Sequence, residues 1–225
     1  MRQAIGKRCC AVLILAVLLL GLAGCGTAET GGARAKVCFI YTDGLLDDLC
    51  AIEYLSKSYD TAVILLQDPE GLAGNDYASP SVTDKEAFFR TVSGWFKSVT
   101  EYSDSVDLSE ADFYLLGPLT EFAALLREKP SLKANRTLLM AGAAVGPDGA
   151  GEEWNAAADE EAYRYVTETM TDLTQITATA CEILYEAEGY PFQAQFLEEY
   201  ITRMEALDEN LCCYDLQAVS VVLKN

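Results

Sequence analysis

Short apolar runs alternate with longer amphipathic segments along the chain from residue 36 onward. The apolar runs predict strands at 36–42, 61–67, 112–117 and 136–142, and the amphipathic segments predict helices at 48–57, 87–99, 119–128 and 159–170. Capping-box patterns start at Thr83 and Thr179, and Pro191 fits the first turn of a further helix over 191–207. Because strands separated by helices form βαβ units, the sequence predicts one α/β domain with a mainly parallel open sheet and helices on both faces.

The first 25 residues are set apart by their composition. Basic residues at positions 2, 7 and 8 precede an apolar stretch that ends in small residues just before Cys25. This is the pattern of an export signal, and the stretch is short for a membrane-spanning helix. Residues 22–25, LAGC, resemble a bacterial lipobox, which implies cleavage before Cys25 and attachment of diacylglycerol to its sulfur. An uncleaved N-terminal anchor is the alternative.

These features predict the domain organisation and the location. We expect a lipoprotein signal peptide over 1–25, a flexible tether of small and polar residues over 26–35, and a folded domain over 36–225. A lipid or an uncleaved helix would each hold the protein outside the cytoplasm, and we expect a lipid anchor in the bacterial cell membrane.

The chain is acidic and contains no histidine. It has 35 Asp and Glu residues against 16 Lys and Arg residues, a formal charge of −19, which becomes about −22 if the three basic residues of the first 25 are lost. Such a surface repels nucleic acid, which is therefore a poor partner, and we expect no nucleic-acid binding. The absence of histidine excludes Ser-His-Asp and Cys-His catalysis and histidine-ligated metals. Carboxylates, tyrosines, amides or a bound cation must carry out any chemistry.

Five of the eight cysteines lie in the predicted domain: Cys38, Cys50, Cys181, Cys212 and Cys213. An odd number cannot all pair within one chain, and no C-x-x-C pair indicates a zinc site. Cys38 and Cys50 lie in apolar stretches, so we predict that they are buried thiols that contribute to packing.

The segment FIYTDGLLDD, residues 39–48, places three aspartates directly after an apolar strand. Asp43 follows the carboxyl end of that strand, where open α/β sheets bind their ligands, and Asp47 and Asp48 fall at the start of the next helix. A helix N-terminus stabilises a carboxylate, so a simple N-cap explains Asp47 alone equally well. Three mutually repelling carboxylates without nitrogen or sulfur ligands favour a hard cation, Ca²⁺ or Mg²⁺.

Three later stretches add to this pattern. LLGPLTEFAALL (115–126), LLMAGAAVG followed by EEWNAAADEEAYRYV (within 138–166), and YDLQAV (214–219) occur in that order after YTDGLLDD. Together these motifs resemble the inosine-uridine nucleoside hydrolase family, whose motifs are D-x-D-x-G-x-D-D, G-P-L-T-N, M-G-G with E-F-N-x-x-x-D-P-E-A, and H-D-P-L-A-V. The resemblance covers most of residues 36–223 and implies that family's fold, a three-layer open sheet of the Rossmann type.

The resemblance implies a calcium site and a catalytic base. The ion would be held by Asp43, Asp48, Asp215 and the backbone carbonyl of Thr120, a set of oxygen ligands that suits calcium. Asp43 would also act as the general base toward the attacking water. The implied reaction is calcium-dependent hydrolysis of the N-glycosidic bond of ribonucleosides, which releases base and ribose in purine and pyrimidine salvage.

The resemblance also implies a sugar site and partners. Asp47, Glu153 and Asn155 would bind ribose hydroxyls, and Trp154 stands at an aromatic position of the sugar pocket, although core packing explains it equally well. The expected partners are a ribonucleoside or another small ribosyl molecule and, through the lipid, the membrane. Base preference and a possible homo-oligomer are left open by the sequence.

The sequence departs from the family pattern in several places. Tyr41 replaces the first aspartate, Glu121 replaces the asparagine after G-P-L-T, and Asn75 is only a distant match for the sugar-binding asparagine expected after the second strand. Tyr214 stands where the family has a histidine. Its hydroxyl is the candidate proton donor to the departing base, a weak one with an ordinary pKa near 10, and stacking on the base or a structural role explains it equally well.

Two alternative functions follow from these departures. One is a surface lipoprotein of the same fold that binds a ribosyl ligand without catalysis. The other is a haloacid-dehalogenase-type phosphatase, since YTDGLLDD is similar to that family's strand end, but its nucleophilic position is Tyr41, which cannot form an acyl-phosphate.

Overall fold

The computed structural model of the chain describes residues 37–140 and 153–223. The predicted signal peptide, the tether, the lipidation site Cys25 and part of the third motif lie outside these residues. Within the described residues, no helix combines the length and the apolar character that crossing a membrane requires.

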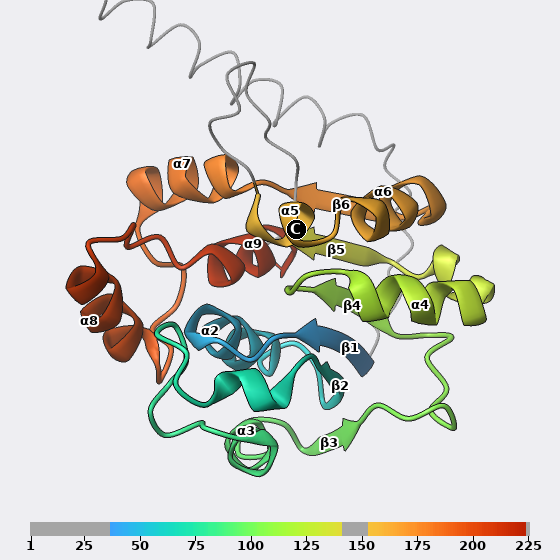
Figure 1. Cartoon of the computed structure of the whole chain (residues 1–225), viewed down its shortest axis with the longest axis horizontal. Coiled ribbons are helices and arrows are strands. Elements are labelled where there is room, and N and C mark those ends of the chain that lie inside the picture. Colours follow the sequence, from blue (N-terminus) through green and yellow to red (C-terminus); the bar gives the residue numbers. More distant parts are fainter. Residues whose placement is uncertain (1–36, 141–152, 224–225) are drawn as a thin grey trace, which may run out of the picture. The chain divides into compact units, whose positions relative to one another are not determined.

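A six-stranded sheet, parallel throughout, forms the centre of the domain (Figure 1). The strands are β1 (Val37–Thr42), β2 (Thr61–Leu66), β3 (Ser98–Glu101), β4 (Asp112–Leu115), β5 (Thr137–Met140) and β6 (Leu173–Ile176). Their order across the sheet is β3-β2-β1-β4-β5-β6. The predicted parallel α/β sheet is confirmed, and it gains two edge strands, β3 and β6, that the sequence patterns did not indicate.

Helices connect the strands. The α-helices of the described residues are α2 (Leu46–Leu55), α3 (Lys85–Val92), α4 (Thr120–Glu128), α5 (Trp154–Ala158), α6 (Glu160–Thr169), α7 (Ala178–Glu188), α8 (Leu197–Leu207) and α9 (Tyr214–Leu223). Two short 3-10 helices, η1 (Pro69–Leu72) and η2 (Pro130–Ala134), lie in the connections.

Each face of the sheet has its own hydrophobic core, because side chains alternate between the faces along a strand. Cys38 and Ile40 of β1 belong to the core that also contains side chains of α2, α8 and α9. Phe39 and Tyr41 belong to the second core, which contains side chains of α4 and α6. Helices therefore cover both faces, as predicted, and the interior strands are apolar on both sides, as is usual in a parallel sheet.

The predicted helix over 87–99 is wrong in its second half. α3 ends at Val92, and Ser98–Glu101 pairs with β2 as the edge strand β3. The cap is Asp84, one residue after the predicted Thr83, and its carboxylate accepts from Ala87 N at 2.9 Å. The polar, β-branched sequence at 98–101 therefore follows its strand propensity once β2 offers a free edge.

Two other predicted helix starts are also shifted. Thr177, rather than Thr179, caps α7, and its hydroxyl accepts from Ala180 N at 3.1 Å. α8 begins only at Leu197, because residues 190–196 form a separate non-helical segment that packs through aromatic side chains such as Phe192. The predicted cysteine packing is confirmed for Cys38 and Cys50, and all five cysteines of the domain are buried free thiols.

Candidate functional site

The strand order places a topological switch point between β1 and β4. The chain leads from β1 outward to β3 on one side and from β4 outward to β6 on the other, and open α/β sheets bind ligands where the carboxyl ends of two such strands diverge. A cavity of about 640 Å³ lies at this point, a size typical of small-molecule sites. Its lining includes Asp43 after β1, Leu116 and Pro118 after β4, and Asp215 on α9.

The turn from β1 into α2 positions an acidic side chain through Thr42. The Thr42 hydroxyl accepts from the backbone N–H of Gly44 at 2.9 Å and donates to the carboxylate of Asp48. Gly44 has a φ of +79°, which favours glycine, and a Cβ there would lie 2.9 Å from Leu66 Cδ1. The turn is thus shaped so that a buried hydroxyl holds Asp48 in one place.

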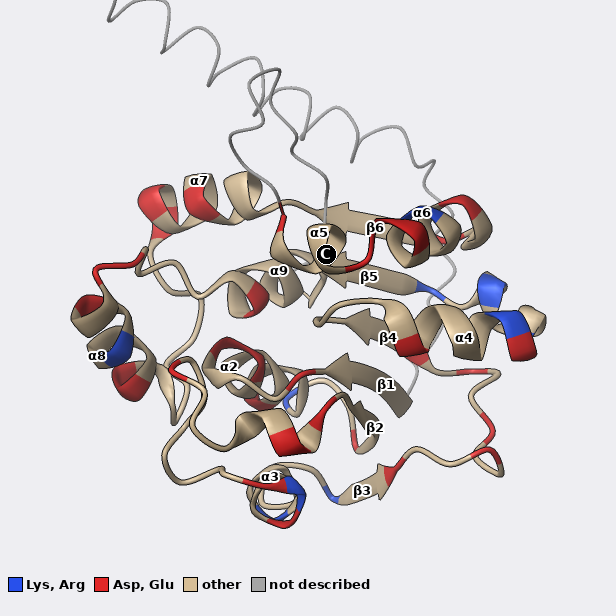
Figure 2. Ribbon diagram, viewed as in Figure 1, with Lys and Arg blue, Asp and Glu red and all other residues tan. Residues whose placement is uncertain are grey.

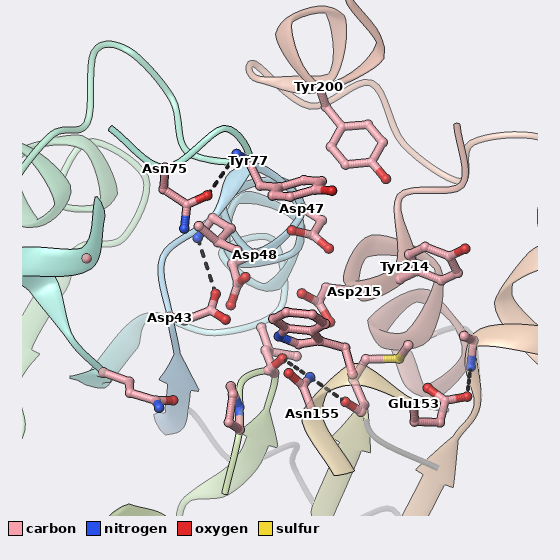
Figure 3. A pocket seen from close by; sticks show the side chains of 18 of the residues that line it. Asp43, Asp47, Asp48, Asn75, Tyr77, Glu153, Asn155, Tyr200, Tyr214 and Asp215 are labelled. Carbon is pink, nitrogen blue, oxygen red and sulfur yellow. Dashed lines mark hydrogen bonds between the residues drawn. The ribbon is translucent and has the colours of Figure 1, made fainter. Parts of the chain in front are cut away.

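α2 starts at Leu46, two residues earlier than predicted. Asp47 and Asp48 lie in its first turn, where free backbone N–H groups and the positive end of the helix dipole stabilise carboxylates. Leu45 occupies the N-cap position, so the interpretation of Asp47 as a simple N-cap is wrong. The helix start instead directs both carboxylates to the pocket (Figure 3).

α9 supplies a fourth carboxylate. This helix packs against α2, and Asp215 in its first turn is 3% exposed. Carboxylate oxygens of Asp47, Asp48 and Asp215 lie within 4.8 Å of one another, and the carboxyl of Asp43 contacts that of Asp48 (Figure 3). No ion pair among the described residues includes any of these four aspartates. We call these four residues the aspartate cluster.

Burial is the largest cause that raises the pKa of each carboxyl in the cluster. The pKa of Asp47 rises to about 6, with the charge of Asp43 as the second cause. Burial raises the pKa of Asp48 and of Asp215 well above the usual range of an aspartate, and the neighbouring carboxylates raise it further. A divalent cation would oppose this effect, because it stabilises the ionised forms.

The chemistry of the aspartate cluster fits a hard divalent cation. Carboxylate oxygens are the preferred ligands of Ca²⁺ and Mg²⁺, and the cluster has no basic partner within the described residues. Asp47, predicted to bind sugar, belongs to the tightest group of three, together with Asp48 and Asp215.

The structure does not bring Thr120, a predicted ligand, into the lining of the pocket. Thr120 is the first residue of α4, so its carbonyl oxygen is directed along the helix. Its hydroxyl donates to Asp159 Oδ2 at 2.8 Å. Leu116 and Pro118, which lie between the end of β4 and the start of α4, line the pocket instead.

Asn155 and Glu153, at the start of α5, line the pocket and already have backbone partners. Asn155 Nδ2 donates to the carbonyls of Leu116 at 2.7 Å and Met140 at 2.9 Å, which ties the ends of β4 and β5 together. Asn155 therefore has only its carbonyl oxygen left for a ligand. Glu153 Oε1 accepts from the backbone N–H of Ala178 at 2.6 Å, and burial raises the pKa of Glu153 to about 7.

Two aromatic side chains of the predicted site differ from expectation. Trp154 is 80% exposed and lines the pocket, so the interpretation of Trp154 as a core residue is wrong. Tyr214 also lines the pocket, but its hydroxyl donates to Glu182 Oε1 at 2.9 Å. Burial and the hydrogen bond to Glu182 raise the pKa of Tyr214, which makes it a weaker proton donor than a free tyrosine.

Two departures from the family pattern contact each other. The hydroxyl of Tyr41 donates to Glu121 Oε2 at 2.6 Å and lies 3.1 Å from Gln67 Oε1. Tyr41 packs in the core beneath α4 beside Phe122, whereas Asp43 lies in the pocket. The residue at the family's first aspartate position therefore contributes to packing here and adds no carboxylate to the cluster.

Two walls of the pocket were not predicted. One consists of α8 and the loop after it, with Tyr200, Met204, Glu209 and Asn210, and the other of the loop after β2, with Gln67, Asp68, Asn75 and Tyr77. No motif marks these residues. The one usable signal is the position of Asn75 after the second strand, where the family places a sugar-binding asparagine.

Comparison of the chain with protein-family models, with curated proteins and with solved structures gives no significant match. The nucleoside hydrolase assignment therefore stays a prediction from the four ordered motifs of this sequence.

Proposed function

We propose that this protein is a calcium-dependent hydrolase that cleaves the N-glycosidic bond of ribonucleosides. The observation that carries the proposal is the aspartate cluster: four carboxylates from the start and the end of the domain's sequence, with no basic partner among the described residues, in a pocket at the switch point of a parallel sheet. The order and spacing of the four motifs add support. As an extracytoplasmic lipoprotein, such an enzyme would act in the salvage of purines and pyrimidines.

In this reaction, different residues of the chain would accept the proton, stabilise the developing charge and bind the sugar. Asp43 accepts the proton of the attacking water, as a buried carboxylate with a raised pKa can do. The negative charge of the cluster stabilises the positive charge that develops on the sugar in an oxocarbenium-like transition state. The carbonyl oxygen of Asn155 accepts a hydrogen bond from a sugar hydroxyl. When bound by Asp47, Asp48 and Asp215, calcium would supply a positive charge that polarises the water and orients the ribose diol.

Release of reducing sugar from a panel of nucleosides, with calcium and with a chelator, tests this proposal. We expect calcium-dependent release in the native protein and a loss of about 10³-fold in the Asp43→Asn variant, the range usual for removal of a general base. Glu86→Gln, on the exposed surface of α3, is the matched control and should retain full activity. Absence of release from every nucleoside would contradict the proposal.

A binding protein without catalysis is the second candidate. The hydrogen bond from Tyr214 to Glu182 favours it, because this bond occupies the hydroxyl proton that the departing base would need. Calorimetry with ribose and nucleosides separates the two functions. Binding without any release of sugar would support the second candidate.

A further inference from the structure

The pocket carries far more negative charge than one divalent cation can offset. Besides the aspartate cluster, Asp68, Glu153 and Glu209 line it, which makes seven carboxylates. No lysine or arginine of the described residues lines it, and the chain has no histidine. Figure 2 shows acidic segments at the start of α2 and in the loop after β2, and Asp47, Asp48 and Asp68 of these segments line the pocket. The field in such a pocket attracts cations and repels phosphorylated ligands.

Apart from Glu153, whose pKa burial raises to about 7, and the hydroxyl of Tyr77, the described lining offers little that can protonate a departing base. The hydroxyl of Tyr200 donates to Cys212 O at 2.6 Å, and that of Tyr214 donates to Glu182. Asn155 donates both amide hydrogens to backbone carbonyls, and the amide of Gln67 can donate a hydrogen bond but cannot release a proton. A leaving group that needs no proton would suit this site.

Two exposed aromatic side chains line the same pocket. Trp154 is 80% exposed and Tyr77 is 42% exposed, and among the described residues they are the exposed large hydrophobic side chains. Trp154 follows β5 and Tyr77 follows β2, so they reach the pocket from opposite sides of the switch point. An aromatic face attracts a cation, most strongly when the cation is itself flat enough to stack.

We propose that the preferred substrates are ribosides whose base carries a fixed positive charge, such as N-ribosylpyridinium ions and N7-alkylated purine ribosides. This inference rests on the proposed hydrolase function and names its substrate class. The C1′–N bond breaks with its electron pair moving to the ring nitrogen, which cancels the ring charge. The water oxygen bonds to C1′, and the water proton passes to Asp43 and then to solvent. No general acid is needed, because the base leaves as a neutral molecule.

A binding titration tests the charge preference independently of turnover. The probes are 1-methylnicotinamide, a cation, and nicotinamide, its neutral counterpart, and the signal is the fluorescence of Trp154 in the Trp95→Phe protein. We expect at least tenfold tighter binding of the cation at low salt and a smaller preference at 0.5 M salt. Equal or tighter binding of nicotinamide would overturn the proposal.

Charge variants locate the effect in the pocket. Asp68 caps η1, and asparagine at this position keeps the cap. Glu209 lies in the loop after α8. Both residues belong to the walls of the pocket and are separate from the aspartate cluster. Asp68→Asn and Glu209→Gln should each weaken binding of 1-methylnicotinamide by about twofold or more and leave nicotinamide binding unchanged. Glu86→Gln, outside the pocket, should change neither. Unchanged cation binding in both pocket variants would overturn the proposal.

Hydrolysis assays separate this inference from the function on which it rests. We expect 7-methylguanosine and nicotinamide riboside to be cleaved with kcat/KM at least tenfold above guanosine and uridine. If no riboside of either charge is cleaved, the hydrolase function is wrong. If guanosine is cleaved as efficiently as 7-methylguanosine, the substrate class is wrong. A loss of guanosine cleavage in Glu153→Gln would then identify Glu153 as the proton donor.

Discussion

Buried aspartates at the two ends of the sheet differ in whether a basic side chain pairs with them. At the amino end of β4, Asp112 is 8% exposed and fully paired: Arg136 donates to both carboxylate oxygens, and the hydroxyl of Tyr59 donates at 2.5 Å. At the carboxyl end of the adjacent β1, the aspartate cluster has no basic partner in the described structure. The first arrangement stabilises the fold with nothing bound, whereas the second leaves negative charge for a ligand to neutralise.

This difference indicates which buried aspartates stabilise the fold and which are available to bind a ligand. Burial of a charge costs free energy unless a partner offsets it, so without a bound cation the carboxyls of the cluster favour their protonated forms, as their raised pKa values show. Asp112 has its partner within the chain. The aspartate cluster has no such partner among the described residues, and it lies at the place where parallel sheets bind ligands. We expect changes at the two ends to have opposite consequences for stability and binding.

The largest expected effect is stabilisation of the protein by calcium. At a calcium concentration one hundred times Kd, the free energy of unfolding should rise by about 2.7 kcal/mol, and urea unfolding measures it. The effect should depend on pH. The pKa of Asp47 is raised from 3.8 to about 6, so its contribution to stability without calcium is full below pH 4 and is lost as the pH rises through about 6.

Calcium should therefore stabilise the protein strongly at pH 7.5 and weakly at pH 4.5. The matched comparison is the same unfolding curve in a chelator at both pH values. A calcium effect that is equal at the two pH values would show that the carboxylates of the cluster are not its site.

Removing the ion pair between Arg136 and Asp112 should destabilise the fold without affecting calcium binding. Arg136→Met leaves Asp112 buried without a cation and should lower the free energy of unfolding by about 2 kcal/mol, less than for a fully buried pair because Arg136 is partly exposed. Calcium affinity, measured by calorimetry, should not change. Arg90→Met removes the exposed pair with Glu86 and serves as control, with an expected change of less than about 0.5 kcal/mol.

Thr42 should act on binding through Asp48. Thr42→Val removes the hydroxyl that holds the Asp48 carboxylate, and such supporting partners typically contribute tenfold or more to metal affinity, about 1.4 kcal/mol. Thr42→Ser keeps the hydroxyl and should bind calcium within about threefold of the native protein. Equal affinities of the valine and serine variants would mean that Thr42 does not position Asp48 for binding.

The smallest effect should be a gain in the stability of the protein when one carboxylate of the aspartate cluster is removed. Asp215→Asn removes one of several mutually repelling buried carboxylates, so in a chelator at pH 7.5 the variant should be more stable by about 1 kcal/mol. It should also lose most of the calcium-induced stabilisation. A variant that is destabilised in the chelator would show that Asp215 supports the fold and would remove the contrast with Asp112.

Much of the fold follows from local patterns. The interior strands were predicted because continuous apolar runs bounded by polar turns indicate buried parallel strands, and β1 was placed nearly to the residue. β3 was missed because SVTE is short and polar and becomes a strand only through its pairing with β2. α8 was placed too early because Pro191 resembles a helix start, whereas aromatic packing holds residues 190–196 in another conformation.

The residues of the site also divide into those that local sequence patterns predicted and those that they did not. Asp43, Asp47 and Asp48 could be found from one short segment, because a strand end followed by a helix start places them together. Asp215 was found only through the motif order, and the structure places it beside them. Thr120 was predicted as a ligand from a family motif, which does not show which way a carbonyl points, and the structure does not place it in the pocket lining. The walls from α8 and the loop after β2 carry no motif, so their approach to the pocket could not be predicted.

The sequence by itself determined the parallel α/β architecture, the excess of acidic groups and the lack of histidine, since these depend on composition and on the periods of neighbouring residues. Only the tertiary structure decided which buried aspartates have a partner, which hydroxyls are already engaged, and which aromatic side chains stay exposed in the pocket. The physical reason is that pairing and exposure depend on contacts between segments distant in the chain, and those contacts arise from the packing of whole helices on the sheet.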